Sequence, residues 1–165
     1  MWVVAAEVIG SDATGLARTL MISQGEDEGL KLGMAVLSNQ GIVGKIIAVS
    51  PSSSKVLLIH DHNSALDAFD QRSRARGIIS GVVDSGMVMK YVERGEDVKI
   101  GDTVISSGFD GIFPRGLLVG RVTAVERKGL FLNVELATAV DFRRLEQVLV
   151  VTQPPPAQVA EQGQS

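Results

Sequence analysis

The sequence predicts an all-β fold: two packed six-stranded β-barrels related by an internal sequence repeat, with little helix. Three observations support this prediction. Apolar residues alternate with a period of two, turn residues separate the apolar runs, and the second half of the chain repeats a pattern of the first. The 165 residues also include 18 glycines but only 4% aromatic side chains. This composition is typical of short strands joined by tight turns, because glycine adopts positive φ without a steric penalty.

The first half of the chain contains six predicted strands. They lie near residues 3–9, 17–22, 34–37, 42–49, 55–59 and 65–71. Turn residues separate them, as in Ser23 to Gly25 before the third strand and Ser38 to Gly41 before the fourth.

The second half contains six more predicted strands. They lie near residues 76–83, 87–92, 103–106, 117–126, 130–137 and 146–151. The clearest is 130–137, where Leu130 shares one face with three further aliphatic residues at 132, 134 and 136, and Phe131 lies on the other face. We expect the aliphatic face to be buried and Phe131 to be exposed.

The repeat divides the chain into two units. Residues 25–36 (GEDEGLKLGMAV) resemble 95–104 (GEDVKIGDTV), and 43–49 (VGKIIAV) resemble 119–125 (VGRVTAV). A closed barrel suits so short a unit, because closure leaves few unpaired strand edges. We therefore expect a first barrel in 1–72, a second in 73–152 and a disordered Pro/Gln-rich tail in 153–165. Whether the last strand returns to the first barrel stays open.

Charge and composition exclude several classes of protein. Sixteen basic residues against nineteen acidic ones give a net charge of -3, which offers no electrostatic footprint for nucleic acid. The absence of cysteine excludes disulfides, thiolate metal sites and cysteine nucleophiles. No run approaches the roughly 18 apolar residues that span a bilayer. A membrane anchor upstream of this sequence stays possible.

Side chains that carry catalytic or metal chemistry are few. The only histidines, His60 and His62, flank Asp61. Neighbouring residues of an extended segment point to opposite faces, so Asp61 is badly placed to orient His60 as a catalytic triad requires. Two histidines without a third ligand make a weak zinc site. We therefore expect no catalytic residue, no cofactor and no metal site.

Surface side chains remain as candidates for binding a partner. Phe131 lies opposite the aliphatic face of its strand, Tyr91 lies on a strand of which either face could be core, and 107–114 is a glycine-rich insertion with two phenylalanines. Arginines at 72, 74 and 76 would share one face of an extended segment. Each feature also has an interpretation without a partner. Phe131 could be an isolated exposed phenylalanine, the insertion could plug the second barrel, and the arginines could form a charged strand that discourages edge pairing. The expected partner-binding residues are Phe131, Tyr91, Phe109, Phe113, Arg72 and Arg74.

One long stretch resembles a known family. Residues 101–122 (GDTVISSGFDGIFPRGLLVGRV) closely resemble the signature of the bacterial rod-shape-determining protein MreC family. Residues 41–44, 61–65 and 139–150 support the match, and the resemblance extends from Ala6 to Val151.

The resemblance implies a non-catalytic scaffold of the cell-elongation machinery that maintains rod shape. Family members have an inner-membrane helix, a coiled coil and a periplasmic pair of β-barrels, and this sequence resembles the last part without the anchor. The implied partners are an elongation-specific penicillin-binding transpeptidase, MreD, RodZ, the MreB complex and further copies of the chain, as a homo-oligomer or filament. A barrel adaptor of an envelope transport assembly and a double-barrel serine protease are the alternatives.

Overall fold

The computed structural model describes residues 2–12, 17–82 and 86–152. Within these ranges it contains twelve strands and one short 3-10 helix, η1, at Glu26–Glu28. The strands, in chain order, are β1 Val3–Asp12, β2 Thr19–Ile22, β3 Ala35–Ser38, β4 Gly41–Val49, β5 Ser54–Leu58, β6 Leu66–Asp70, β7 Arg76–Gly81, β8 Met87–Glu93, β9 Thr103–Ser106, β10 Leu118–Lys128, β11 Phe131–Thr138 and β12 Gln147–Val151. The all-β prediction is confirmed.

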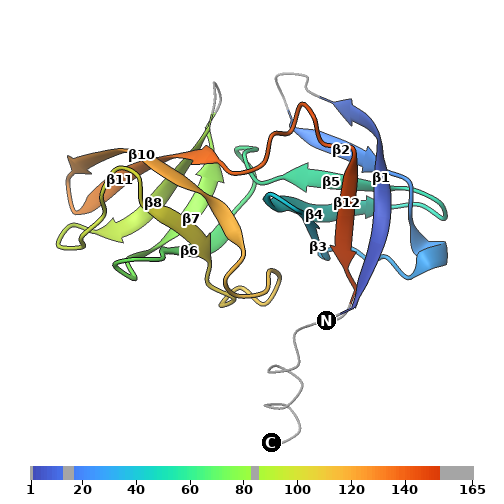
Figure 1. Cartoon of the computed structure of the whole chain (residues 1–165), viewed down its shortest axis with the longest axis horizontal. Coiled ribbons are helices and arrows are strands. Elements are labelled where there is room, and N and C mark those ends of the chain that lie inside the picture. The colour runs from blue at the N-terminus through green and yellow to red at the C-terminus, as the bar shows by residue number, and fades with distance from the viewer. Residues whose placement is uncertain (1, 13–16, 83–85, 153–165) are drawn as a thin grey trace, which may run out of the picture.

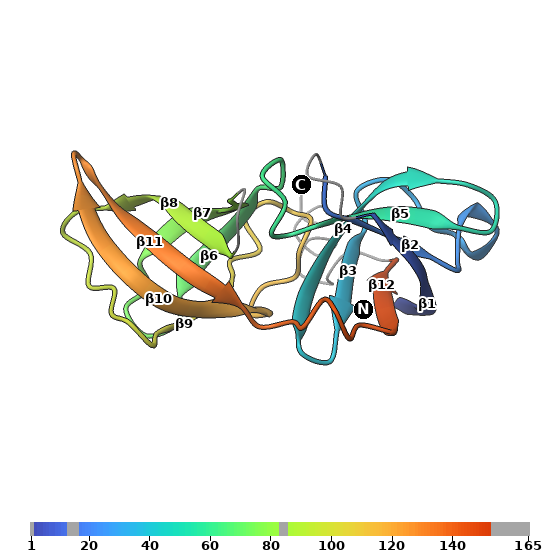
Figure 2. The ribbon, with the colours of Figure 1, turned by 90° about the horizontal axis from the view of Figure 1, so that it is seen from above.

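The strands form two closed antiparallel barrels that lie side by side along the long axis of the molecule (Figure 1). The order around the first barrel is β1-β12-β3-β4-β5-β2, and around the second it is β10-β11-β8-β7-β6-β9. Seen from above, two segments cross between the barrels, one after β5 and one after β11 (Figure 2). The prediction of two six-stranded barrels is therefore confirmed.

The internal repeat continues at the level of topology. If β1 to β5 are matched with β7 to β11, neighbours in the first barrel correspond to neighbours in the second. The sixth strand of each repeat is the exception, because it lies in the barrel of the other repeat. β12, from the second repeat, lies between β1 and β3, and β6, from the first repeat, lies between β7 and β9. Each repeat thus gives its last strand to the other repeat's barrel.

This exchange corrects the barrel border expected near residue 72. β6 belongs to the second barrel although it precedes that border, and β12 belongs to the first barrel. Alternation of apolar residues indicates which face of a strand is buried, but it does not select the neighbouring strand. The expected tail, 153–165, lies outside the described residues.

A glycine stands at the same place in both copies of the repeat because two strands approach closely there. A Cβ at Gly44 would overlap the carbonyl oxygen of Leu57 on β5, and a Cβ at Gly120 would overlap that of Ala137 on β11. Only a residue without a side chain permits this approach. The Val-Gly-Lys/Arg pattern that both repeats share therefore marks the same close approach of two strands in each barrel.

Buried apolar side chains fill both barrels. Ile22 belongs to the cluster of the first barrel, and Met89 to that of the second. The second cluster also includes Leu37 and Ile42 from the first barrel, so apolar packing continues across the contact between the barrels. Phe142, in the crossover before β12, packs against both clusters. The two barrels are therefore held together by a shared core.

Candidate partner-binding surface

The outer face of the second barrel carries a β-bulge at Tyr91. In the pairing of β8 with β11, Leu132 lies opposite Val92 and Val134 lies opposite Met89, so the register shifts between these two pairs. Tyr91 falls within this shift and has φ +64°. A bulky residue with positive φ is strained by about 1–3 kcal/mol, and such strain is often found at functional sites. Bulges also redirect side chains.

Tyr91 forms an exposed aromatic pair with Phe131. The ring centroids are 5.8 Å apart and the planes meet at 88°, an edge-to-face arrangement. Tyr91 is 62% exposed and Phe131 is 40% exposed. The aliphatic side chains at 132, 134 and 136 are buried as predicted, whereas Leu130 is in the β10–β11 turn and is exposed. Two predicted anchors are thus in contact with each other and accessible to a partner.

A groove of about 430 Å³ begins at Tyr91 and crosses the exposed face of β6, β7 and β8. Arg74 and Arg76 line it together with acidic side chains. The lining also includes Asp67, Gly77, Ile78, Glu93 and Glu96. Tyr91 and Arg74, far apart in the sequence, therefore border one depression that offers both an aromatic and an ionic wall.

An ion pair fixes one wall of this groove. Arg76 donates hydrogen bonds from Nε and Nη2 to the two carboxylate oxygens of Asp67, at 2.9 and 2.8 Å. Ser107 Oγ donates to Asp67 as well, at 2.6 Å. The hydrogen bond from Arg76 is the main cause that holds the pKa of Asp67 below its usual value. The Arg76 guanidinium also lies 4.2 Å from the ring centroid of Phe109, which is 64% exposed.

The structure places two predicted partner residues elsewhere. Phe113 is only 3% exposed and belongs to the core of the second barrel, so its prediction as a partner anchor is wrong and the plug interpretation is right for it. Arg72 donates hydrogen bonds to the carboxylates of Asp97 and Asp102. That guanidinium is occupied within its own barrel and does not line the groove beside Tyr91.

Sequence reasoning missed other parts of this surface. Asp67 forms the groove wall with Arg76, which the sequence had already placed among the candidate arginines. Phe69 and Arg115 lie next to Arg74, and the guanidinium carbons of Arg74 and Arg115 are near the Phe69 ring. The bulge had no sequence signal, because Tyr91 holds a conformation that usually marks glycine. A signal for Phe69 was present, since it alternates with core residues of its strand.

The histidines considered as catalytic or metal-binding residues lie at the junction of the barrels. The His60 ring stacks on Phe142, and its Nδ1 is buried without a hydrogen-bond partner. Burial, helped by Arg18, lowers the pKa of His60 to about 4. Asp61 accepts hydrogen bonds from the backbone N–H groups of Arg18 and Asn63, at 2.7 and 2.8 Å. These contacts connect the crossover to the first barrel.

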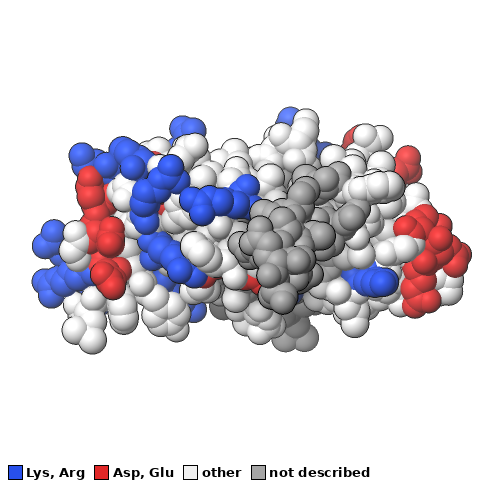
Figure 3. All heavy atoms as spheres, turned by 90° about the horizontal axis from the view of Figure 1, so that it is seen from below, with Lys and Arg blue, Asp and Glu red and all other residues white. Residues whose placement is uncertain are grey.

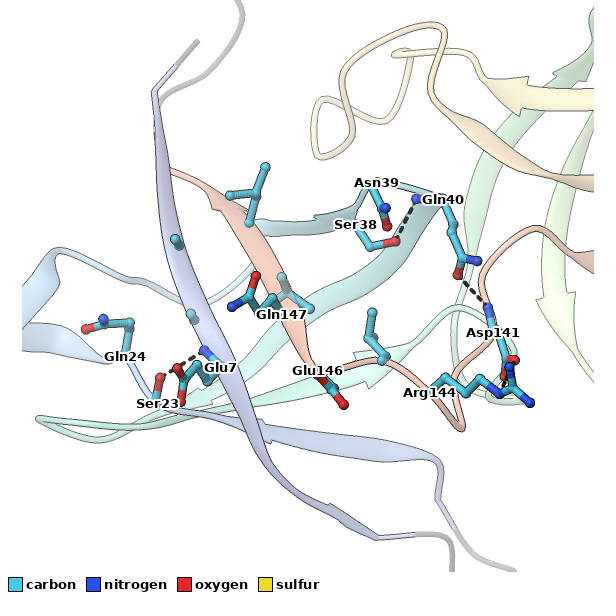
Figure 4. A pocket seen from close by; sticks show the side chains of 15 residues that line it. Glu7, Ser23, Gln24, Ser38, Asn39, Gln40, Asp141, Arg144, Glu146 and Gln147 are labelled. Atoms are coloured by element: carbon cyan, nitrogen blue, oxygen red, sulfur yellow. Dashed lines mark hydrogen bonds and ion pairs between the residues drawn. The ribbon is translucent and has the colours of Figure 1, made fainter.

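A second groove, with a volume of about 880 Å³, lies on the first barrel (Figure 4). It is bounded by β1, β12 and the turn between β3 and β4, and polar side chains such as Asn39 and Gln147 line it. Gln40 accepts a hydrogen bond from the backbone of Asp141, and the Glu7 backbone donates to Ser23. The groove is polar and open, and it contains none of the predicted partner residues.

In the described ranges 2–12, 17–82 and 86–152, no three His, Cys, Asp or Glu side chains gather where they could hold a metal ion. Nor does any helix in this part of the chain have the length and apolar character that crossing a bilayer requires.

Comparison with known proteins identifies the family. The family model for the barrel core of the rod shape-determining protein MreC matches residues 8–152. The chain belongs to the MreC family. The cell shape-determining protein MreC of Caulobacter vibrioides is 30% identical over 160 residues, which are 97% of this chain and 45% of that relative. The MreC of Bacillus subtilis is 30% identical over an alignment of 165 positions, which covers 92% of this chain and 57% of the relative. The chain thus spans about half the length of these relatives.

Solved MreC structures share the double barrel. The crystal structure of MreC from Pseudomonas aeruginosa has a TM-score of 0.86 and 30% identity, covering 92% of this chain and 99% of that one. MreC in a complex between Penicillin-Binding Protein (PBP2) and MreC from Helicobacter pylori has a TM-score of 0.72 and 17% identity, covering 92% of this chain and 100% of that one. The second likeness shows the fold alone.

Proposed function

We propose that this MreC-family chain is a non-catalytic periplasmic scaffold of the cell-elongation machinery, which binds a penicillin-binding transpeptidase through the outer face of its second barrel. The observation that carries the proposal is the exposed Tyr91–Phe131 pair beside the groove. The MreC of Helicobacter pylori, which has the same fold, forms a complex with PBP2. The curated relatives of the present chain are named as cell shape-determining proteins.

The surface has the composition that a binding site for a folded protein needs. A stable interface buries about 1,200–2,000 Å² in total, and a few aromatic and arginine side chains supply most of its energy. Tyr91 and Phe131 are the apolar anchors, Arg74 supplies positive charge at the groove, and Phe109 extends the aromatic surface beyond Arg76. Binding here would hold the transpeptidase in place or favour its active conformation.

The binding test uses the transpeptidase ectodomain and three variants of the present chain. Tyr91→Ala and Phe131→Ala should each weaken binding by about tenfold or more, because aromatic anchors of an interface contribute about 2 kcal/mol or more. Leu32→Ala is the matched control, since it removes an exposed apolar side chain from the first barrel. Unchanged affinity for both aromatic variants, measured by calorimetry, would contradict the proposal.

The proposal also includes self-association and the partners MreD, RodZ and the MreB complex, for which membership of the family is the support. Light scattering of the chain, alone and with the transpeptidase ectodomain, tests the first of these. An increase in mass with concentration supports a homo-oligomer or filament. A constant monomer mass over the whole concentration range contradicts it.

The absence of catalysis is part of the same proposal. The His60 ring is stacked on Phe142, and its pKa of about 4 makes the ring a weak base at neutral pH. A serine-reactive phosphonate should therefore not label the protein. Labelling that depends on His60 would instead support the double-barrel protease.

A further inference from the structure

Phe69 is an outward-facing aromatic side chain that is nevertheless buried. In β6, Leu66 and Ala68 belong to the core of the second barrel, and alternation directs Phe69 to the opposite face of the sheet. Phe69 is not part of the core cluster, yet it is only 5% exposed. Something on the outside of the barrel therefore covers the ring.

Two arginines form part of that cover. The guanidinium carbons of Arg74 and Arg115 lie 5.1 and 5.0 Å from the centroid of the Phe69 ring. Both arginines are exposed residues, and their guanidinium groups lie over the ring as in a cation–π contact. Two positive charges thus share one ring, although like charges repel each other.

These two guanidinium groups differ from those of the arginines next to them in sequence. Arg72 pairs with Asp97 and Asp102, and Arg76 pairs with Asp67. Within the described part of the chain, no ion pair joins Arg74 or Arg115 to a carboxylate. Both guanidinium groups at the Phe69 ring are therefore without an ion-paired carboxylate among the described residues, although Glu93 and Glu96 line the same groove as Arg74.

Each arginine is held in place by its backbone. Arg74 has φ +68° in a turn where the Asp70 carboxylate accepts hydrogen bonds from the N–H groups of Arg72 and Ser73. A non-glycine residue in this conformation is strained. The segment before Arg115 is fixed by Ser106, whose Oγ donates to the carbonyl of Pro114 at 2.6 Å. Little backbone freedom would therefore remain to be lost at these positions on binding a ligand.

We propose that Arg74 and Arg115, stacked on Phe69, form a binding site for a carboxylate of an acidic segment in the partner protein. Two guanidinium groups provide several N–H donors in planar arrays, the geometry that carboxylates match. Arg74 also lines the groove beside Tyr91. A partner segment with an apolar residue at Tyr91 and an Asp or Glu nearby would occupy both sites. This inference rests on the proposed function and specifies the chemistry of the partner.

The charge distribution of the whole face favours an acidic partner. Seen from below, Lys and Arg side chains gather over the second barrel and surround a band of Asp and Glu there, while a further acidic group lies at the far end of the first barrel (Figure 3). The basic side chains would attract an acidic segment locally to the second barrel, and the acidic group would repel it from the far end of the first.

One arm of the test needs no transpeptidase. Acetylated tetraglutamate is titrated into the protein while the arginine Nε–Hε signals are followed by NMR, with tetraglutamine as the uncharged control. The signals of Arg74 and Arg115 should shift first and saturate together. Arg121 and Arg127 are the internal comparison, because both are exposed arginines on β10. No shift at Arg74 and Arg115, or equal shifts at all four arginines, would overturn the inference.

The other arm measures affinity for the transpeptidase ectodomain. Arg74→Gln/Arg115→Gln should weaken binding by about tenfold and reduce the salt dependence of binding. Arg121→Gln/Arg127→Gln, which removes the same charge elsewhere, should change the affinity little. Arg74→Lys/Arg115→Lys retains the charge, and its affinity should lie between those of the wild type and Arg74→Gln/Arg115→Gln. Equal affinity of the two glutamine pairs overturns the inference and leaves the proposed function intact. Absence of binding by the wild-type chain would instead contradict the proposed function, and the peptide titration then decides the inference alone.

Discussion

The rings of His60 and Phe142 stack with their centroids 4.3 Å apart, and each ring lies in one of the two segments that cross between the barrels. The stack therefore joins the two crossovers at the point where the barrels meet. Arg18 supports it by donating a hydrogen bond to the carbonyl of His60 at 2.7 Å. The histidine that sequence analysis considered for catalysis belongs to this junction.

Replacing His60 should change how stability depends on pH. The pKa of His60 is about 4 in the folded chain against 6.5 for an unperturbed histidine, chiefly because of burial. Between these values the unfolded chain binds more protons, so wild-type stability falls as the pH falls from about 6.5 to about 4. His60→Phe retains a ring to stack on Phe142 and removes this loss.

Urea unfolding at pH 7 and pH 5 measures the effect. We expect the fall in unfolding free energy between these pH values to be smaller for His60→Phe than for wild type. His62→Phe is the matched control, since the His62 side chain is half exposed, and it should retain the wild-type fall. An identical fall in all three proteins would show that His60 does not titrate at the junction.

Asp70→Asn should stabilise the protein at neutral pH. Burial, together with a hydrogen bond to Asp102, raises the pKa of Asp70 to about 6, and its Oδ2 is buried without a donor. An acid whose pKa is raised on folding loses stability as the pH rises from about 3.8 to about 6, because the folded chain holds the proton longer. The amide introduced by the substitution would instead donate to Asp102 at every pH.

Thermal unfolding tests this prediction. Asp70→Asn should raise the melting temperature at pH 7 to 8 and change it little near pH 4. The hydrogen bond from Arg72 lowers the pKa of Asp102, which stabilises the fold above about pH 3.8 and thus acts in a different pH range. Destabilisation by Asp70→Asn at pH 8 would mean that the new amide does not form the hydrogen bond to Asp102 on which this prediction rests.

Tyr91→Gly should separate the strain of the bulge from the binding of a partner. Positive φ costs a non-glycine residue about 1–2 kcal/mol, more than the roughly 0.5–1 kcal/mol by which glycine destabilises a strand through entropy. Since Tyr91 has φ +64°, Tyr91→Gly should be more stable than Tyr91→Ala by up to about 1 kcal/mol.

Denaturant unfolding and transpeptidase binding are measured on the same two variants. Both variants should bind the transpeptidase weakly, since both lack the ring. The free energy of unfolding should be higher for Tyr91→Gly than for Tyr91→Ala. If Tyr91→Ala is the more stable of the two, the positive φ at this position is not a source of strain.

The strand exchange predicts which fragments fold. Residues 66–138 contain all six strands of the second barrel, whereas 73–152 lack β6 and end in a strand whose partners are absent. We expect 66–138 to give a dispersed amide NMR spectrum and 73–152 to give that of an unfolded chain, because a barrel that lacks one strand exposes two edges. The chain 2–152 is the folded reference. Dispersed spectra from 73–152, or none from 66–138, would contradict this reading of the topology.

Part of the candidate surface could be predicted from residue pattern. Phe131 alternates with buried aliphatic residues, so its outward position followed from the period of the strand. Phe109 and Phe113 show the limit of such reasoning. Both lie in one glycine-rich insertion, yet the first is exposed and the second is in the core. In an irregular loop no period relates position to burial, and the fold of the loop decides.

The sequence by itself determined the strands, the number of barrels and the family. These depend on local alternation, on turn residues and on a repeated motif, all of which can be recognised within short segments of the chain. Only the tertiary structure decided which strand completes which barrel and which charged groups meet. β12 closes the first barrel, Arg72 is neutralised by two carboxylates, and Arg74 joins Arg115 on Phe69. Strand pairing and charge pairing depend on contacts between residues distant in the chain, which local periodicity does not specify.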